Sequence, residues 1–498
     1  MLFQRKLNNQ KNKKFQICPF KLKINEKEAS SFRIKDENID ESIKKTLEYL
    51  NSSNEDYVKF GVFLFQRYFF VKASESEEAK NSNKTYEFYI DKFLEHNFIE
   101  NIQKLLMKNN DPYVLYDSLC GLINFTNFPS INNQFDYYEL FSSDKFLEIY
   151  KKIIMNDNSY IVTNLYEFLY NLCYENQICL NKLYQNNFLQ LSLNKYASNI
   201  TNNYQELIEY LHFIAVMAKN VNSFSSKEKE NFFRIFYKFL SNTQEDEVIA
   251  CSLIGLNYLN EYDKSDDSTI VNLIKENYNF INMLISINYL NYPAYLQLNL
   301  ITVFKILINY FEKIESNNIL NILNNTQILE FFSFIYNTIE RPNIHLKILE
   351  TILIIIKSND LNIILKVTRH NILNSVILTS LTDFDFSVRK TGLLIILNIL
   401  NINNFDVAAD FSKTVFIEYL VQKFLKNETE KDIIKLSLEI IYCFIKSGNV
   451  LGNKNPFSQN LRAAGIEDIL NKENNFLTDD ITQIIEKIKK ELNFDVIN

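Results

Sequence analysis

Short apolar helical segments recur along this chain and end in similar ways. Examples are Leu119–Asn124, Glu167–Asn171, Ile254–Tyr258, Leu394–Asn398 and Leu438–Tyr442. Asn171 follows Asn124 after 47 positions, and Tyr442 follows Asn398 after 44. This regular spacing indicates that one supersecondary unit is repeated many times, because self-similarity at a fixed period is the signature of a repeat architecture.

A period near 45 residues is that of armadillo and HEAT arrays, in which each unit is a small group of helices. The chain has 498 residues, more than one hydrophobic core usually holds. A solenoid avoids this limit because each repeat packs only on its neighbours. We therefore predict an all-α fold, an armadillo-type α-solenoid with a right-handed superhelix of about nine to ten repeats. In such arrays the long concave surface binds the ligand.

The composition supports helices and argues against an enzyme. Hydrophobic residues make up 47% of the chain, whereas Gly and Pro occur only 7 and 6 times. So few turn residues disfavour β-rich folds. The sequence contains no G-x-G-x-x-G motif, P-loop or nucleophile elbow, and its four histidines lack metal-ligand spacing. We expect neither enzymatic activity nor a cofactor nor a metal.

Positive charge is concentrated at the N-terminus. Residues 1–25 hold seven basic side chains and no acidic one, although the net charge of the whole chain is −7. Such a segment on an acidic body can bind an acidic partner or its own body; a solvated, disordered terminus is the alternative. We predict a basic tail over residues 1–40, repeats over 41–488 and a C-terminal tail over 489–498.

The cysteines indicate a reducing compartment. They are scattered, and most lie on apolar helical faces: Cys18, Cys120, Cys173, Cys179, Cys251 and Cys443. We expect reduced, buried thiols, and the absence of a C-x-x-C pair disfavours a zinc or redox site. We find neither a signal peptide nor an apolar run of the roughly 18 residues that a membrane span needs. The expected location is therefore the cytoplasm and nucleus.

Asn stands at several joints between helices, for example Asn97, Asn277 and Asn371. The residue after a helix often adopts a left-handed conformation, and Asn tolerates that conformation best after Gly. We therefore predict that these residues end helices. Because Asn is abundant throughout the chain, background composition is the alternative explanation.

The order of the repeats resembles that of importin-α, the adaptor family of nuclear import. Asp432–Gly448 is similar to the last full repeat of the family, and Asn455–Ile469 to the segment that follows it. Val388–Asn398 resembles the preceding repeat and Glu247–Leu259 the central one. The resemblance extends over about residues 40–490.

The resemblance implies how a ligand would bind. Importin-α holds extended lysine-rich segments in its concave groove, and each repeat offers a Trp and, four residues later, an Asn. One helical turn places both on the same face. In the family, the Asn holds the cargo backbone, the Trp rings flank the lysine stems, and acidic residues receive the ammonium groups.

This chain departs from that pattern because it contains no Trp. The aligned Trp positions hold other residues: Cys120, Glu167, His212, Ile254, Thr351 and Leu394. The Asn positions that differ hold Val216, Lys305 and Ile355, and the family Arg falls on Ile301. An exposed cation–π contact is worth roughly 0.5–1 kcal/mol, so losing several would weaken binding of a basic peptide by orders of magnitude.

The positions that match the family define our candidate peptide-binding site: Asn124, Asn171, Glu175, Glu247, Tyr258 and Asn398. Three of them keep the family Asn, Tyr258 keeps the central Tyr, and Glu175 and Glu247 match acids that receive lysine heads. Two alternatives remain open. The Asn matches could reflect composition alone, and the carboxylates could be ordinary solvated helix ends.

The basic tail also has a counterpart in the family. Importin-α begins with a basic segment that binds importin-β and, when free, folds back on the groove. Arg5, Lys6, Lys11, Lys13 and Lys14 resemble a thin version of that segment, so the resemblance implies importin-β binding or autoinhibition by residues 1–25.

Two functions follow. The first is an importin-α-like adaptor that binds basic protein segments in its groove for nuclear import. The second is a structural armadillo scaffold in a larger assembly, without signal binding, which the absence of Trp favours. We expect no membrane partner, and no nucleic acid bound by the acidic body, because its charge repels phosphate.

Overall fold

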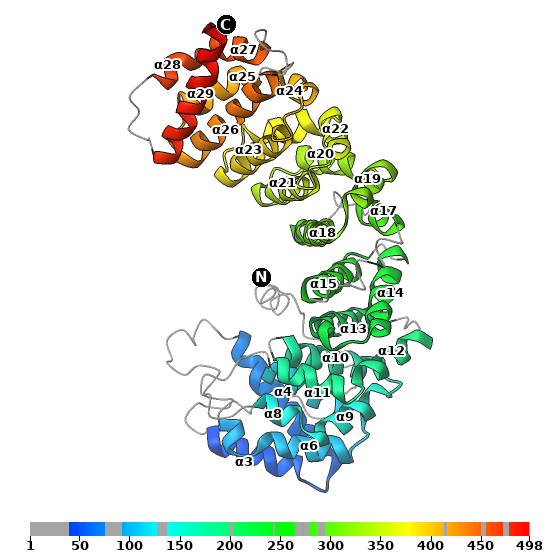
Figure 1. The fold of residues 1–498 in the computed structure, drawn as a ribbon. Coiled ribbons are helices and arrows are strands. Elements are labelled where there is room, and N and C mark those ends of the chain that lie inside the picture. The colour runs from blue at the N-terminus through cyan, green and yellow to red at the C-terminus, as the bar shows by residue number, and fades with distance from the viewer. Residues whose placement is uncertain are drawn as a thin grey trace. The chain divides into compact units, whose positions relative to one another are not determined.

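The structure is a computed structural model, and all secondary structure that it describes is helical (Figure 1). The chain divides into two compact units, Met1–Ser223 and Phe224–Asn498. The structure describes these residues: 39–74, 92–126, 137–174, 176–198, 203–242, 245–263, 272, 278–286, 294–412, 416–449, 455–471 and 478–497. Within them, no helix is long and apolar enough to cross a bilayer.

The first unit is built on four helices that pack side by side in chain order: α4 (Glu55–Ser74), α7 (Pro112–Thr126), α10 (Ser159–Tyr174) and α13 (Tyr204–Met217). We call these and their equivalents in the second unit the ladder helices. The other helices of the unit are α3 (Ile39–Leu50), α6 (Phe98–Lys108), α8 (Tyr137–Phe141), α9 (Asp144–Ile154), α11 (Gln177–Gln185), α12 (Phe188–Ser198) and the 3₁₀-helix η3 (Ala218–Ser223).

The second unit repeats the arrangement. Its ladder helices pack in the order α15 (Asp246–Tyr262), α18 (Ala294–Lys313), α21 (Pro342–Ile356), α23 (Phe386–Leu400), α26 (Lys431–Gly448) and α29 (Asp479–Ile497). The other helices are α14 (Ser226–Asn242), α17 (Tyr278–Ser286), α19 (Ser316–Asn325), α20 (Ile328–Thr338), α22 (Leu361–Arg369), α24 (Phe405–Ser412), α25 (Phe416–Tyr419), α27 (Pro456–Ala463), α28 (Ile466–Leu470) and the π-helices η4 (Leu373–Leu378) and η5 (Leu420–Leu425). Helices α14, α17, α19 and α22 lie on the side of this unit opposite its ladder helices (Figure 1).

The ladder helices are buried because neighbours surround them. In α10, the apolar residues that the sequence places on one helical face, such as Ile161, Leu165 and Phe168, are fully buried. Tyr166, which lies outside that run, is also fully buried, since α10 packs against both α7 and α13. A helix that is apolar nearly all round is expected in such a position.

Two glycines let helices approach closely. A Cβ atom on Gly255 of α15 would lie 2.2 Å from the ring of Phe236 on α14, and one on Gly121 of α7 would lie 2.3 Å from the ring of Phe65 on α4. Such distances are far below van der Waals contact, so a side chain at Gly255 or Gly121 would have to displace the ring. The rings of Phe236 and Phe65 fill the space that such a side chain would occupy.

The expected role of Asn at the joints is confirmed at Asn97, whose φ is 52° directly before α6. Asn371 also lies at a joint, between α22, which ends at Arg369, and η4. It does not adopt the left-handed conformation, because it is not among the residues with positive φ and its carbonyl accepts from Ser375 N–H, as in a helical turn. Asn277 lies outside the described residues. Other left-handed Asn residues are Asn187, Asn359 and Asn403.

Lysines of one repeat cap helices of the repeat before it. Lys152 Nζ of α9 donates to the carbonyls of Met107 and Asn109 at the end of α6, at 3.3 and 3.2 Å. Lys195 Nζ of α12 donates in the same way to Ile154, at 2.8 Å, at the end of α9. These ammonium groups satisfy carbonyls that have no partner inside the helix and complement the helix dipole.

The described part of the repeat region begins and ends with a helix. Helix α3 begins at Ile39, and α29 continues to Ile497. The C-terminal segment expected as a tail over residues 489–498 is therefore helical up to Ile497. Its apolar residues keep the helical period, as Ile488 and Leu492 are buried, while the basic tail up to residue 38 lies outside the described residues.

A buried ion pair stabilises the start of the second unit. Lys229 Nζ of α14 lies 2.9 Å from Asp263 Oδ1, directly after α15, and the two side chains are 9% and 0% exposed. Removing one partner of a buried pair leaves an uncompensated charge, which typically costs about 3–5 kcal/mol.

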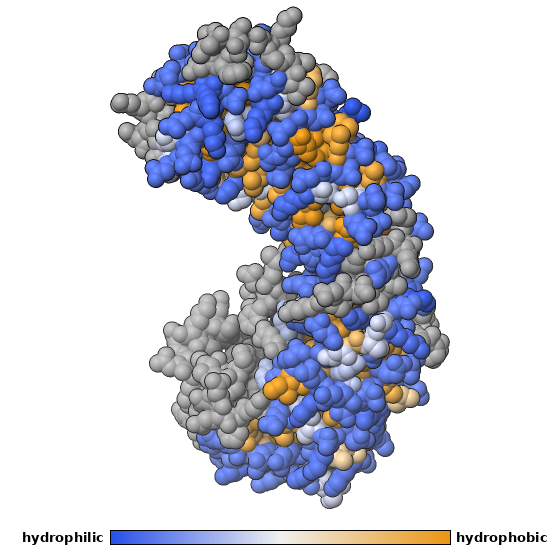
Figure 2. Space-filling model, in the orientation of Figure 1, coloured by the Kyte–Doolittle hydropathy of each residue, from blue (hydrophilic) through white to orange (hydrophobic). Residues whose placement is uncertain are grey.

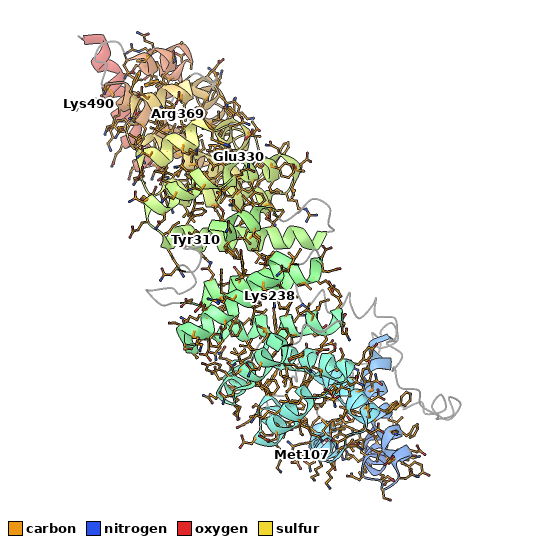
Figure 3. All side chains as sticks on the ribbon, turned by 90° about the vertical axis from the view of Figure 1, so that its right-hand side faces the viewer. Met107, Lys238, Tyr310, Glu330, Arg369 and Lys490 are labelled. Carbon is orange, nitrogen blue, oxygen red and sulfur yellow. The ribbon has the colours of Figure 1, made fainter. Side chains whose placement is uncertain are left out.

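We expect Lys229→Met to lower the midpoint of urea unfolding substantially, by about 3–5 kcal/mol of unfolding free energy. The double variant Lys229→Met, Asp263→Leu should recover most of this loss, because no buried charge remains. Lys238→Met on the exposed face of α14 (labelled in Figure 3) serves as control. Equal midpoints for Lys229→Met and Lys238→Met would show that the pair does not contribute.

Asp111 fixes the start of ladder helix α7. Its Oδ1 accepts from the N–H groups of Tyr113 and Val114, at 2.9 and 3.2 Å, and its Oδ2 lies 2.9 Å from Lys59 Nζ of α4. Partial burial opposes ionisation, but the hydrogen bond from Lys59 and those from the two N–H groups outweigh it and lower the pKa of the Asp111 carboxyl. Pro112 follows at the first helical position, where its missing N–H is harmless.

We expect Asp111→Ala to destabilise the protein by about 1–2 kcal/mol at neutral pH, the usual effect of losing a helix cap and a partly exposed pair. Because the folded-state pKa is depressed, the ionised form stabilises above the unfolded-state pKa of about 3.9, and this contribution is lost as the pH falls below it. Thermal unfolding from pH 3 to pH 7 should show the difference between variant and wild type shrinking at acid pH. Asp111→Asn keeps a capping oxygen, so its deficit should be smaller.

Candidate functional site

In each unit, the ladder helices leave a strip of half-exposed residues, which we call the ladder face of that unit. In the first unit it contains Glu167, Tyr170 and Tyr174 of α10 and His212 of α13, and in the second unit it contains Ile254 and Tyr258 of α15. The spacing of three to four residues within a helix matches one side of an α-helix. A partner that lies along this face would meet one or two side chains from each repeat.

Most positions that align with the family Trp residues reach this face. Cys120, Glu167, His212, Ile254 and Leu394 are all half-exposed. The alignment is wrong at Thr351, which is fully buried and whose hydroxyl donates to the carbonyl of Lys347. In α21 the half-exposed residues nearest to Thr351 are Glu350, Leu353 and Ile354.

The candidate residues of the first unit lie on α7 and α10. Asn124 is half-exposed, and its Nδ2 lies 3.5 Å from the carbonyl of Gln66 on α4. Asn171 is only 8% exposed. Glu175 lies outside the described residues, as do Arg5, Lys6, Lys11, Lys13 and Lys14 of the tail.

The candidate residues of the second unit lie on two ladder helices that are not neighbours. Glu247 is half-exposed in the first turn of α15, and Tyr258 lies further along this helix with its ring 5.9 Å from that of Tyr262. Asn398 is half-exposed on α23, and its Nδ2 donates to the carbonyl of Leu394 one turn earlier, at 2.8 Å. Helices α18 and α21 separate α15 from α23 in the ladder.

The structure places two tyrosines that sequence reasoning did not select, Tyr170 and Tyr174, beside His212, an aligned Trp position. The ring of Tyr170 lies 5.5 Å from that of Tyr174, one turn further along α10, and 5.4 Å from the imidazole of His212 on α13. Tyr170 and Tyr174 follow Glu167, an aligned Trp position, by three and seven residues, so helical periodicity alone could have placed them on the ladder face. We call Tyr170, Tyr174 and His212 the aromatic strip.

Carboxylates accompany the aromatic strip. Glu209 of α13 is 8% exposed; its Oε1 accepts from Gln205 Nε2 at 2.9 Å, and its Oε2 lies 3.4 Å from His212 Nδ1. Glu206, one turn earlier, is 4% exposed, bonds to the hydroxyl of Ser159 and lies 3.8 Å from Lys195 Nζ. Burial lowers the pKa of the Lys195 ammonium, and Glu206 opposes this shift.

The ladder face of the second unit has a different character. Lys390 Nζ of α23 lies 2.5 Å from Asp432 of α26, and Lys435 of α26 lies 3.0 Å from Asp480 of α29. Each pair joins two successive repeats, and its two charges neutralise each other. Half-exposed aliphatic residues lie on α21 and α23: Leu346, Leu353, Ile354, Leu394 and Leu397. Hydrophobic residues also reach the surface around α20 to α23 in Figure 2.

Comparison with known proteins identifies the fold. No family model matches this chain. No curated protein matches it either. Among solved structures, an engineered protein determined by a structural genomics consortium has a TM-score of 0.66 at 13% identity, over 91% of this chain and 98% of its own.

A second similar structure is β-catenin, from a study of the phosphorylation switch that controls its interaction with cadherin. It has a TM-score of 0.55 at 12% identity, over 91% of this chain and 86% of its own. A designed armadillo repeat protein has a TM-score of 0.41 at 15% identity, over 53% of this chain and all of its own. The chain has the armadillo-repeat fold, as the sequence predicts. The narrower resemblance to importin-α stays a prediction.

The described part of the chain contains no group of three or more His, Cys, Asp or Glu residues placed to hold a metal ion. Its cysteines are free, and all except the half-exposed Cys120 are buried. Burial raises the pKa of the Cys443 thiol to about 11, and it also raises the pKa of Cys173.

We expect Cys173 and Cys443 to resist iodoacetamide at pH 7.5 in the folded protein, because the thiolate is the reactive form and a raised pKa keeps these groups protonated. Mass spectrometry should find both unmodified in native protein and alkylated after denaturation. Cys120 should react faster than either. Rapid alkylation of Cys443 in native protein would contradict the burial described above.

Proposed function

We propose that this armadillo-repeat protein is an adaptor that binds extended, lysine-rich segments of other proteins along the ladder face of its first unit. The observation that carries this proposal is the combination of Glu167 and Glu209 with the aromatic strip on two adjacent ladder helices. Carboxylates attract cations at long range, and aromatic faces bind them at contact.

The armadillo fold supports a protein-binding role. A solenoid offers a continuous surface on which an extended segment meets one repeat after another. The β-catenin structure comes from work on an interaction with cadherin, so one protein with this fold and a similar length binds a protein partner. By analogy, the ligand of this chain is a protein segment and not a small molecule.

We further propose the finer assignment that the resemblance to importin-α implies, nuclear import of basic cargo between cytoplasm and nucleus. In this proposal, Asn124 and Asn171 hold the cargo backbone and Glu175 receives a lysine head. The tail over residues 1–40, with Arg5, Lys6, Lys11, Lys13 and Lys14, binds importin-β or occupies the ladder face when cargo is absent. A second, weaker site would use residues of the second unit: Glu247, Tyr258 and Asn398.

One observation favours the alternative of a scaffold that does not bind basic signals. The half-exposed aliphatic residues of α21 and α23, such as Leu346, Ile354 and Leu394, suit an apolar partner. Lys390 and Lys435 are paired with acids in this region, so charge contributes little there. A stable partner that binds the second unit independently of salt, together with no binding of basic peptides, would support this alternative.

We expect a fluorescent lysine-rich peptide to bind the protein saturably in low salt and to bind Glu167→Lys about tenfold more weakly, a change of about 1.4 kcal/mol. The new charge would repel the ligand, and Glu167 is only half-buried, so a larger effect is not expected. Fluorescence anisotropy measures the dissociation constant. Affinity should fall as salt rises, because screening weakens exposed charge interactions.

The matched control is Glu100→Lys, which makes the same charge change at an exposed position of α6 in the first unit, away from the ladder helices. It should bind as the wild type does. Equal weakening by Glu100→Lys and Glu167→Lys would show a general charge effect and no defined site. No binding by the wild type would remove the adaptor proposal.

A further inference from the structure

One ring of the aromatic strip already carries a cation from the same chain. Lys219, in η3 after α13, holds its Nζ 4.3 Å from the centre of the Tyr174 ring and donates to the backbone carbonyl of Tyr174 at 2.8 Å. Tyr174 is the last residue of α10. The ammonium therefore meets both the π-face of the ring and the negative end of the helix dipole.

This contact differs from others of its kind in the described residues. Lys423 lies over Tyr419 and Lys446 over Tyr442, but each of these pairs is separated by four residues, as neighbours on one turn of a continuous helical segment are. Lys219 instead reaches Tyr174 from the following repeat, 45 positions later in the chain. Tertiary structure brings the two together, which indicates that the surroundings of Tyr174 favour a cation.

The remaining members of the strip extend the same surroundings across the two repeats. Tyr170 lies between Tyr174 and His212, in ring contact with both. Glu209 lies beside His212, with 3.4 Å between Glu209 Oε2 and Nδ1, and Glu167 precedes Tyr170 by one turn of α10. Two tyrosine rings next to His212, with one carboxylate in contact with this imidazole and another one turn away on α10, match the aliphatic stem and charged head of Lys or Arg.

We propose that Tyr170, Tyr174 and His212 form a binding site for one lysine or arginine side chain of a partner, and that Lys219 is a resident cation that competes with this side chain. The inference rests on the adaptor function proposed above and names its central contact. In this proposal the chain binds cations without Trp, because Tyr170 and Tyr174, at helical positions other than the aligned Trp positions, supply the π-faces. The site lies in the first unit, on α10, α13 and η3.

The first experiment removes the rings and keeps their apolar bulk. The probe is a fluorescein-labelled lysine-rich decapeptide, with the same peptide acetylated on every lysine as a control that keeps the stems but loses the charges. Tyr170→Leu and Tyr174→Leu should each weaken binding of the unmodified peptide about threefold, as expected for one cation–π contact. The control variant is Tyr160→Leu on the same helix, whose side chain is 54% exposed and lies outside the strip.

The second experiment removes the resident cation. Lys219→Met should bind the unmodified peptide about threefold more tightly, because a competing charge is lost, even though the variant loses a helix cap and should be less heat-stable. Lys104→Met, at an exposed position of α6 in the same unit, controls for the change in net charge. A purely structural lysine would lower stability without changing affinity.

The outcomes separate the two proposals. If the wild type does not bind the unmodified peptide, or binds the acetylated one equally well, the adaptor function and this site both fail. If the wild type binds selectively but the Tyr170, Tyr174 and Lys219 variants all match their controls, only the site fails. Weaker binding by the tyrosine variants with tighter binding by Lys219→Met supports the inference.

Discussion

Side-by-side packing of the ladder helices is the constraint on which the rest of this structure depends. Within each unit, an inner ladder helix is covered by the ladder helix before it and the one after it, as the burial of Ile161, Leu165 and Tyr166 around α10 shows. Close crossings at Gly121 and Gly255 bring neighbouring helices against aromatic rings. A strip of half-exposed residues remains on these helices, so a partner that binds there contacts a few side chains from each repeat.

The two units use that strip differently. In the first, Glu209 contacts His212 of the aromatic strip, and Glu167 lies one turn before Tyr170 on α10, an environment that favours cations. In the second, Lys390 and Lys435 are paired with Asp432 and Asp480 of the next ladder helix, and half-exposed aliphatic side chains lie on α21 and α23. Exposed ion pairs between successive repeats add little stability, but they neutralise the charge that could attract a ligand.

The loss of Trp does not by itself remove the capacity of the ladder face to bind cations. A π-face is required, and helical geometry allows it to come from a different position on the same strip. Tyr170 and Tyr174 lie three and seven residues after an aligned Trp position, and Lys219 on the ring of Tyr174 is a cation bound in this way. The proposed signal binding therefore depends on the aromatic strip more than on Asn124 and Asn171, one of which is largely buried.

The sequence by itself determined the fold class, the repeat period and the apolar face of helices such as α10, because these follow from local periodicity and from the near absence of Gly and Pro. It also placed Asn97 correctly, since a left-handed turn is a local property. Tertiary structure alone decided the rest. Thr351 is buried because the rotation of α21 is set by its neighbours on both sides. Asn371 follows the end of α22 without a positive φ, because its carbonyl already belongs to the next helical turn. The approach of Lys219 to Tyr174 joins two repeats, and no local pattern encodes a contact that forms only when the helices stack.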